Sequence, residues 1–402
     1  MPAHTTQFER LESYEIAPQG WTHARNSIAL LTAVGVAASA AAYAADAPRF
    51  FASWLVSFAF FVSIGLGALF FVMVQHLTGA AWSVTLRRLM ENCAGTLPAS
   101  ILLFVPVVFG FNDLYKWSNA AAVSPDSILL GKSAYLNPSF FLLRSALYFA
   151  IWGLWAWKLR AISAKQDRTG SIETVRDGAR WSAPGVILLI LTGTLASFDW
   201  IMSLDPHWYS TIFGIYFLSG GALAFIAALI LIALAFRRAG ILRYAITVEH
   251  YHDLGKWLFA LTIFWAYIAF SQYLLIWYAN IPEETIWFRH RLEGSWTWMS
   301  AALLIGHFMV PFLVLLPSSS KRNLKILGLM SAWILAAHFI DLYWQIMPNF
   351  HAHRVEFHWA DAATFAASGG IVSWVFWTGT RARPAVPVGD PRLEKSLEFE
   401  NA

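Results

Sequence analysis

The chain has 402 residues, of which 58% are apolar and 13% are charged, and its formal net charge is +4. An average soluble domain carries about 25% charged residues, so these few charges cannot cover a water-facing surface of this size. The 21 Trp and 31 Phe residues would also leave large apolar patches exposed on a soluble globule. The composition therefore excludes a large soluble domain and a disordered chain. It excludes an outer-membrane barrel as well, because the apolar runs are continuous.

Ten apolar runs are long enough to cross a hydrocarbon core of about 30 Å, which takes about 20 helical residues. They predict an all-α, polytopic membrane protein with ten transmembrane helices. Tryptophans stand near many of their ends, as expected at the level of the lipid headgroups. The runs are 26–44, 50–76, 93–111, 139–157, 181–204, 208–236, 256–279, 296–316, 324–346 and 360–378.

The first run resembles a signal peptide, because Ala42-Tyr43-Ala44 looks like a cleavage site. A long segment containing glutamates precedes it, which favours a retained first span. Of the 28 Lys and Arg residues, 21 fall in segments on the side of the N-terminus and 6 in the opposite loops. The positive-inside rule then places both termini in the cytoplasm.

Three regions follow from this arrangement. Residues 1–25 form a cytoplasmic N-terminal segment, residues 26–378 a membrane domain, and residues 379–402 a cytoplasmic tail. The tail contains several prolines and charges, so we expect it to be disordered. No loop is long enough to fold as a separate domain.

Two charged residues lie inside neighbouring spans at matching depth. Arg144 and Asp199 are each five or six residues from the non-cytoplasmic end of their spans, roughly 8–9 Å below that surface. Burying an ionisable group in lipid costs several kcal/mol, so each is a functional candidate. The two side chains either form an ion pair or reach separately toward the interface.

The ninth span carries a polar stripe. His338, Asp341 and Gln345 are spaced three and four residues apart, so they share one helix face. His307 lies at mid-membrane in the preceding span. A carboxylate beside an imidazole can pass protons, which makes these residues a candidate proton path. The alternative is that the histidines are buried, neutral and bonded to carbonyl groups.

A faint internal repeat relates the two halves of the membrane domain. Asp199 is followed seven residues later by Pro206, and Asp341 seven residues later by Pro348. A duplication of four spans, relating 50–204 to 208–346, would produce this pattern. It suggests two four-helix bundles with two peripheral helices.

Further titratable residues lie outside the spans. Just before the seventh span a cluster could load protons from the cytoplasm, or it could be a solvated loop face; it consists of Glu249, His250, His252 and Asp253. The spacing of His351, His353 and His358 resembles a metal site, but Glu356 is the only acidic partner at suitable spacing. We therefore predict no metal site and assign no catalytic residue.

Several cofactor chemistries have no sequence support. The single cysteine, Cys93, leaves no C-x-x-C-H haem attachment and no cysteine-ligated iron–sulfur cluster. There is no P-loop or dinucleotide motif, so ATP hydrolysis and nicotinamide chemistry are not expected. We expect no covalently bound cofactor and no nucleic-acid partner.

Four segments resemble the NrfD-like ten-span membrane subunits of alternative complex III, most closely the second and shorter of that complex's two such subunits. Residues 197–214 read SFDWIMSLDPHWYSTIFG, residues 289–296 RHRLEGSW, residues 306–312 GHFMVPF and residues 338–344 HFIDLYW. Residues 198–209 are the most specific part, and the likeness covers nearly all ten spans. By motif, Asp199, Asp205 and His207 match the fifth-span segment, and His307, His338 and Asp341 match later family positions.

The resemblance implies a subunit of a respiratory quinol:electron-acceptor oxidoreductase of the cytochrome c type, in the bacterial inner membrane. It implies a proton-conducting path, and possible quinone contacts (menaquinone or ubiquinone) near Arg144, Asp199, Asp205 and His207. Haems and iron–sulfur clusters would belong to partner subunits, alongside a second NrfD-like subunit. The alternatives are an independent secondary transporter and a cofactor-free scaffold for redox subunits. We expect the non-cytoplasmic loops to dock the partners, with Tyr115, Trp117 and Tyr135 as anchors.

Overall fold

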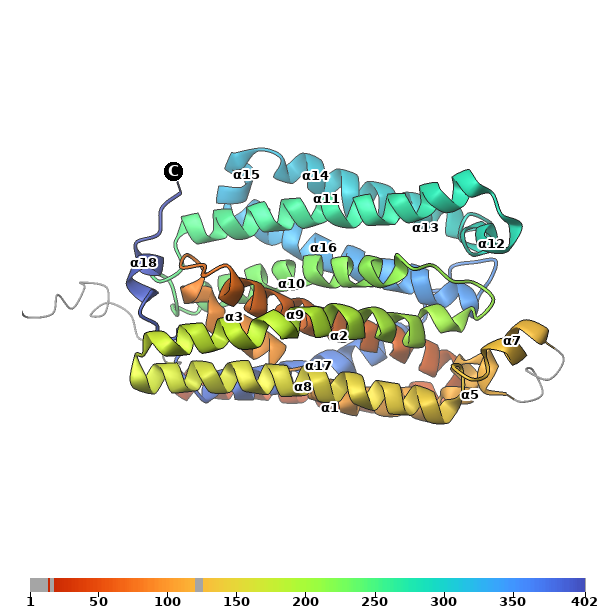
Figure 1. Cartoon of the computed structure of the whole chain (residues 1–402), viewed down its shortest axis with the longest axis horizontal. Helices are drawn as coiled ribbons and strands as arrows, with labels where there is room; N and C mark the ends of the chain where they lie inside the picture. The colour runs from red at the N-terminus through yellow and green to blue at the C-terminus, as the bar shows by residue number, and fades with distance from the viewer. Residues whose placement is uncertain (1–13, 15–17, 120–125, 402) are drawn as a thin grey trace, which may run out of the picture.

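The structure is a computed structural model that describes Tyr14 and residues 18–119 and 126–401. The regular secondary structure of these residues is entirely helical, and the long helices lie roughly along one common axis (Figure 1). The unbroken long helices are α1 (Pro18–Ala45), α2 (Ala47–Leu77), α8 (Pro138–Thr169), α9 (Ile172–Trp200), α10 (Phe213–Arg238), α11 (Val248–Ala279), α16 (Leu324–Ile346) and α17 (Trp359–Arg381).

Two further long segments are interrupted. A turn separates α3 (Val84–Ala94) from α4 (Ala99–Phe109), and a π-helical segment, η3 (Leu303–Met309), joins α13 (Trp296–Ala302) to α14 (Val310–Leu315). The shorter elements are α5 (Phe111–Leu114), η1 (Lys116–Ser118), α7 (Ser127–Lys132), η2 (Met202–Leu204), α12 (Pro282–Arg291), α15 (Ser318–Arg322), η4 (Met347–Asn349) and α18 (Leu393–Leu397).

Within the described part of the chain, nine helical segments are long and apolar enough to cross a membrane. The protein is therefore a polytopic helical membrane protein. Helix α17, which covers the predicted tenth run, is not one of the nine, although it has 23 residues. Glycine, serine and threonine occupy several of its positions, and Asp361 and Arg381 lie in its first and last turns, which lowers its hydropathy.

The two ends of the bundle carry different elements (Figure 1). The α8–α9 turn, α15 and α18 lie at one end, which we call the tail end. Helices α5, α7 and α12 lie at the opposite end, which we call the loop end. The arginine-rich segments that the sequence placed on one side, around the α8–α9 turn and after α17, share the tail end.

Helix α2 is the central helix, since it contacts α1, α3, α4, α9, α10, α16 and α17. Its closest approach is to α10, and two glycines permit it. A Cβ on Gly67 would lie 2.5 Å from the carbonyl oxygen of Gly221, and a Cβ on Gly221 would lie 2.6 Å from that of Ser63. Small residues at such crossings let helix backbones approach closely. This matters in membranes, where the hydrophobic effect does not drive helices to associate.

Local signals explain where several helices begin and end. Asn137 accepts a hydrogen bond from the amide of Phe140 at 2.9 Å, and Pro138 occupies the first turn of α8, where a missing N–H costs nothing. At the other end of α8, Gly170 adopts φ +58°, which favours glycine, and Ser171 caps α9. Two residues thus reverse the chain between two long antiparallel helices.

The third predicted run, 93–111, begins too late. The helical segment starts at Val84, so Arg87, Arg88 and Glu91 lie within it and are buried. They are tolerated because Glu91 forms ion pairs with both arginines, at 3.2 and 3.3 Å. A prediction from hydropathy alone leaves such a segment out of the span, since each charged residue lowers the mean hydropathy.

The tail is ordered in the structure, contrary to the prediction of disorder. Asp390 is buried and forms ion pairs with Arg87 and with Arg392. Ser396 donates a hydrogen bond to the carbonyl of Trp82 at 2.7 Å, and α18 packs against α3. The hydrogen bonds from Arg392 and the charge of Arg87 outweigh the effect of burial and lower the pKa of Asp390 to about 2. The carboxylate is therefore ionised at neutral pH.

Two of the three expected partner anchors lie inside the chain. Tyr115 and Trp117 are 0% and 3% exposed, and they donate hydrogen bonds to the carbonyls of Trp200 and Ser203, both at 3.0 Å. The prediction that they face a partner is wrong, because they instead fix this loop onto the end of α9. Tyr135 remains 38% exposed.

Candidate functional site

Asp341 is the central residue of the candidate site. It lies on α16, 1% exposed, and the two oxygens of its carboxylate accept hydrogen bonds from different helices. The hydroxyl of Tyr216 on α10 donates to one oxygen, and the indole Nε1 of Trp265 on α11 donates to the other at 3.2 Å. Among the described residues Asp341 has no ion-pair partner. Its carboxylate is therefore held by neutral donors only.

His338 lies one helical turn before Asp341, on the same face of α16. One ring nitrogen, Nε2, lies 2.9 Å from the hydroxyl of Ser63 on α2, and the other, Nδ1, is buried with no partner among the described atoms. A Cβ on Gly220 would lie 3.1 Å from the imidazole and 3.6 Å from the Trp265 ring. The glycine of α10 therefore leaves room for both rings.

His307 belongs to the π-helical segment η3. Pro311, four residues later, has no amide N–H to donate to the His307 carbonyl, which favours a departure from α geometry here. The imidazole is fully buried, and neither of its nitrogens has a partner among the described atoms. Its ring centroid lies 3.9 Å from that of Trp265. Single π-helical turns are frequently found at functional sites.

The structure therefore gathers the three residues around one tryptophan. Trp265 donates to Asp341, packs against the tilted ring of His307 and shares the space beside Gly220 with His338. The sequence analysis missed Trp265 and Tyr216. Both are aromatic residues in apolar helices, and such residues give no polar signal in a sequence.

Two glutamines continue the polar column toward the loop end. Gln272 lies two turns beyond Trp265 on α11, and Gln345 lies one turn beyond Asp341 on α16. Both side chains are 2% exposed, and neither Gln272 amide atom nor the Gln345 carbonyl oxygen has a partner among the described atoms. Buried polar groups are nearly always hydrogen-bonded, to protein or to ordered water. These unpartnered atoms would therefore have to be satisfied by ordered water.

The predicted cluster before the seventh span forms the first two turns of α11 at the tail end. Glu249 forms an ion pair with Arg322 at 3.0 Å, and Asp253 forms one with Lys256. Nδ1 of His250 accepts a hydrogen bond from the amide of Thr247 at 3.2 Å, as part of a capping box at the start of α11. The C-terminal segment covers the cluster, since the Phe399 ring lies 5.4 Å from that of His250.

His252 completes this cluster. Its Nε2 lies 3.3 Å from the hydroxyl of Ser318. Asp253 and Trp265 are twelve residues apart, about 18 Å along α11. Apolar side chains fill much of that distance, among them the fully buried Leu258, Leu315 and Ile334. The described side chains therefore do not connect the cluster to the His307 region.

Arg144 and Asp199 meet as a closed ion pair. The Nε and Nη2 of Arg144 donate to the two carboxylate oxygens at 2.9 and 2.8 Å, and the hydroxyl of Tyr148 donates at 2.7 Å. The guanidinium also lies 3.8 Å from the centroid of the Tyr135 ring. This is the contact that the matching depths in neighbouring spans suggested.

Asp205 and His207 do not join this pair. They follow α9 at the loop end, where Nε2 of His207 lies 2.6 Å from a carboxylate oxygen of Asp126. The hydrogen bond with His207 lowers the pKa of Asp126 below its ordinary value. The four residues that the sequence grouped as one site are therefore separated: Arg144 and Asp199 form an ion pair within the helices, whereas Asp205 and His207 lie in a loop, where His207 contacts Asp126.

Arg291 is a second buried arginine that the sequence analysis did not single out. It donates to the carbonyls of Trp344 and Gln345, at 3.1 and 2.7 Å, near the end of α16, and its guanidinium lies 3.5 Å from the centroid of the Trp287 ring. Among the described residues it has no carboxylate partner. A cation at a helix C-terminus is favourable, so Arg291 stabilises the end of the helix that carries Asp341.

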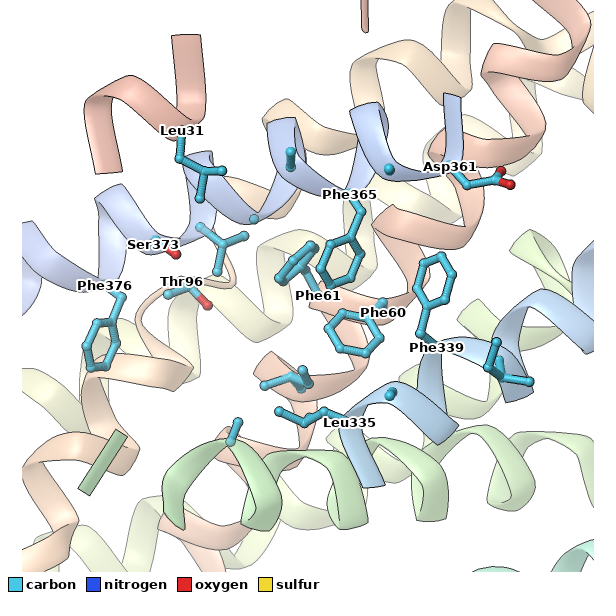
Figure 2. Close-up of a pocket in the computed structure, with 18 of the residues that line it drawn as sticks. Leu31, Phe60, Phe61, Thr96, Leu335, Phe339, Asp361, Phe365, Ser373 and Phe376 are labelled. Carbon is cyan, nitrogen blue, oxygen red and sulfur yellow. The ribbon is translucent and has the colours of Figure 1, made fainter. Parts of the chain in front are cut away.

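An apolar groove of about 1010 Å³ runs beside the polar column, lined mainly by α2, α16 and α17. Figure 2 shows Phe60, Phe61, Phe339 and Phe365 gathered midway along it, with Asp361 at one end. The Phe60 ring also lies 5.5 Å from that of His338. One phenylalanine therefore separates the groove from the column.

Comparison with models of known protein families gives no match for this chain, and a search of curated proteins gives none either.

Proposed function

We propose that this chain is an NrfD-like membrane subunit of a respiratory quinol:electron-acceptor oxidoreductase, and that it conducts protons along α11 and α16. The observation that carries the proposal is the buried carboxylate of Asp341. It has only neutral donors, and two histidines with unpartnered ring nitrogens lie around the same tryptophan. Ionisable residues inside a membrane domain commonly belong to proton relays.

The proposed architecture has ten spans, with α17 as the tenth. Its support is that α17 packs against α1 and α2, two segments that are themselves long and apolar enough to span. A Cβ on Gly35 of α1 would lie 2.4 Å from the backbone nitrogen of Ala367, so this pair is very close. An even number of spans places both termini on one side, the cytoplasm by the charge distribution.

The proposed layout is two four-helix bundles, with α1 and α17 at the periphery. The first contains α2, α3–α4, α8 and α9, and the second contains α10, α11, α13–α14 and α16. The support is that each set is connected by internal helix contacts, and that α2 and α10 form the main contact between the sets.

In the proposed path, protons load at the cluster that begins α11, pass His307 and His338, and leave past Asp341. Water must enter the apolar gap of about 18 Å on the tail side. Gln272 lies two turns beyond Trp265 on α11, so it belongs to the release side of the path.

A quinone contact, if this subunit makes one, fits the apolar groove better than the Arg144–Asp199 pair. Both oxygens of Asp199 are already bonded, whereas the groove is open and lined by apolar side chains. Haems and iron–sulfur clusters belong to partner subunits in this proposal. The isoprenoid tail of menaquinone or ubiquinone would lie along the groove.

Purification from native membranes in mild detergent tests the proposal against the two alternatives. A subunit of this complex co-purifies with c-type haem absorbance, iron–sulfur proteins and a second ten-span chain. A secondary transporter purifies alone or as a homo-oligomer. Measuring protons released per electron in vesicles containing the complex then separates a proton path from a scaffold. If the chain is a scaffold only, Asp341→Asn leaves that ratio unchanged.

A further inference from the structure

A small pocket of about 250 Å³ lies near the tail end and contains two arginines. Arg160 of α8 and Arg383, just after α17, line it together with the α3–α4 turn. Nη1 of Arg383 donates to the backbone carbonyl of Arg160 at 2.8 Å, which holds the two side chains on the same pocket. Among the described residues neither arginine forms an ion pair with a carboxylate.

The carboxylates near this pocket already have partners. Glu91 forms ion pairs with Arg87 and Arg88, and Asp167 forms one with Arg88 at 2.5 Å. Asp390 is bound by Arg87 and Arg392. Burial and the nearby Arg88 guanidinium lower the pKa of Arg383. The region therefore carries more guanidinium groups than carboxylates, and an anion in the pocket would relieve this excess.

Two glycines make room for the Arg160 guanidinium. A Cβ on Gly95 in the α3–α4 turn would lie 2.6 Å from its Nη1, and a Cβ on Gly379 of α17 would lie 3.2 Å from its Nη2. Three separate segments thus shape the position of this side chain. The pocket is therefore partly open but shaped by three parts of the fold, unlike a pair of arginines that happen to meet on a surface.

The depth of the pocket matches the lipid headgroups. A hydrocarbon core of about 30 Å takes about 20 residues of helix, which from the start of α8 at Pro138 ends close to Arg160. Trp157, which also lines the pocket, is 64% exposed, as is usual for tryptophans at the interface. The exposed apolar side chains on the adjoining helices include Ile101, Leu102 and Val105 of α4 and Leu143, Leu147 and Leu154 of α8.

We propose that this pocket binds the phosphate group of an anionic phospholipid, with the acyl chains lying on the exposed faces of α4 and α8. Phosphate oxygens match the fork of donors that a guanidinium presents, and basic pockets between helices on the cytoplasmic side are suited to such headgroups. The site requires only that the helices span a membrane, so it is independent of the proposed quinol chemistry.

Native mass spectrometry of the full-length protein, purified with its accompanying subunits, tests the site. The protein is stripped of lipid and titrated with phosphatidylglycerol, with phosphatidylcholine and with inorganic phosphate alone. Phosphatidylglycerol should bind to the wild type in preference to phosphatidylcholine. In the double variant Arg160→Gln/Arg383→Gln its binding should weaken roughly tenfold or more, the loss expected for two interfacial arginines.

Arg180→Gln is the matched control, since the ion-pair partner of this exposed arginine of α9 within the described residues is Asp177. It should bind phosphatidylglycerol like the wild type. If the double variant does not assemble, Ala161→Glu keeps both arginines and places a carboxylate in the pocket, which should displace the lipid. Three results would each overturn the proposal. They are equal binding of the two lipids to the wild type, unchanged phosphatidylglycerol binding in the double variant or in Ala161→Glu, and binding of inorganic phosphate as tight as that of phosphatidylglycerol.

Discussion

Asp199 and Asp341 are buried carboxylates near the ends of two long helices, and their surroundings differ in one respect. Asp199 is bound by an arginine through two hydrogen bonds and by Tyr148. Asp341 is bound by a tyrosine and a tryptophan, with no cation. Arg291 is the nearest counterpart of Arg144 in this region. It donates to the backbone carbonyls at the end of α16 and not to Asp341.

This difference teaches that similar positions can serve opposite purposes. Protonating a carboxylate that is bound by a guanidinium would leave a buried cation unpaired, which is costly. A carboxylate bound only by neutral donors can accept a proton without leaving an unpaired cation, so protonation changes less of its surroundings. We therefore assign Asp199 to stability and propose Asp341 for proton movement.

The largest effect is expected at the closed pair. Arg144→Ala leaves the Asp199 carboxylate buried and unpaired, which should cost about 3–5 kcal/mol of stability. The free energy is obtained from denaturant unfolding of the purified protein. Arg144→Ala combined with Asp199→Asn should be milder than the sum of the single changes, since the double change removes both charges. Strict additivity would show that the pair contributes nothing as a pair.

A smaller effect on stability, and a larger one on function, is expected at Asp341. Asp341→Asn keeps an acceptor for Tyr216 or Trp265 and removes no ion pair, so it should cost about 1–2 kcal/mol. Under the proposed function, electron transfer persists while the number of protons released per electron falls. The measurement is proton release in vesicles containing the assembled complex.

The nearby Asp361 supplies a matched control for that experiment. It is also buried in a helix, but it forms an ion pair with Arg49 at 2.7 Å and accepts hydrogen bonds from Ser53 and from the amide of His358. Asp361→Asn should lower stability and leave the proton ratio intact. A ratio that is unchanged in Asp341→Asn, with assembly verified, contradicts the proton path.

Much of the fold could be predicted from the sequence, because the physics of spanning is local. The ninth run, 324–346, coincides with α16, and most others match a helix within a few residues at the loop end. The errors lie at the tail end, where helices continue past the hydrocarbon. Buried ion pairs such as Arg87–Asp390 join residues far apart in the chain, and no local pattern indicates them.

The candidate site was predictable only in part. His307, His338 and Asp341 stood out because polar residues are costly in a span. Their connection through Trp265 did not, since it depends on how three helices pack. The grouping of Asp205 and His207 with Asp199 followed from the resemblance of residues 197–214 to one family segment. It failed because the chain leaves α9 between them.

A still smaller effect is expected from Trp265→Phe. This substitution retains an aromatic ring against His307 and removes one hydrogen bond to Asp341, which should cost about 1 kcal/mol. Under the proposed function it lowers the proton ratio partially. Trp200→Phe is the counterpart beside Asp199, where the indole donates to Ser145 at 3.0 Å. Trp200→Phe should reduce stability by a similar amount and leave the number of protons released per electron unchanged. If Trp200→Phe and Trp265→Phe lower that number equally, the two regions do not differ in function.

The smallest effect concerns pH at the loop beside the closed pair. The hydrogen bond with His207 lowers the pKa of Asp126 below its ordinary value of 3.8. A carboxylate with a lowered pKa stabilises the folded loop fully above pH 3.8 and loses this contribution as the pH falls through the lower, folded-state value. Amide hydrogen exchange in α7, corrected for the intrinsic pH dependence, should therefore show constant protection from pH 8 down to about pH 5. His207→Gln should reduce that protection across this range, because among the described residues Asp126 then keeps its bonds to the amides of Ile128 and Leu129. Protection that declines in the wild type between pH 7 and pH 5 would show that a different group controls this loop.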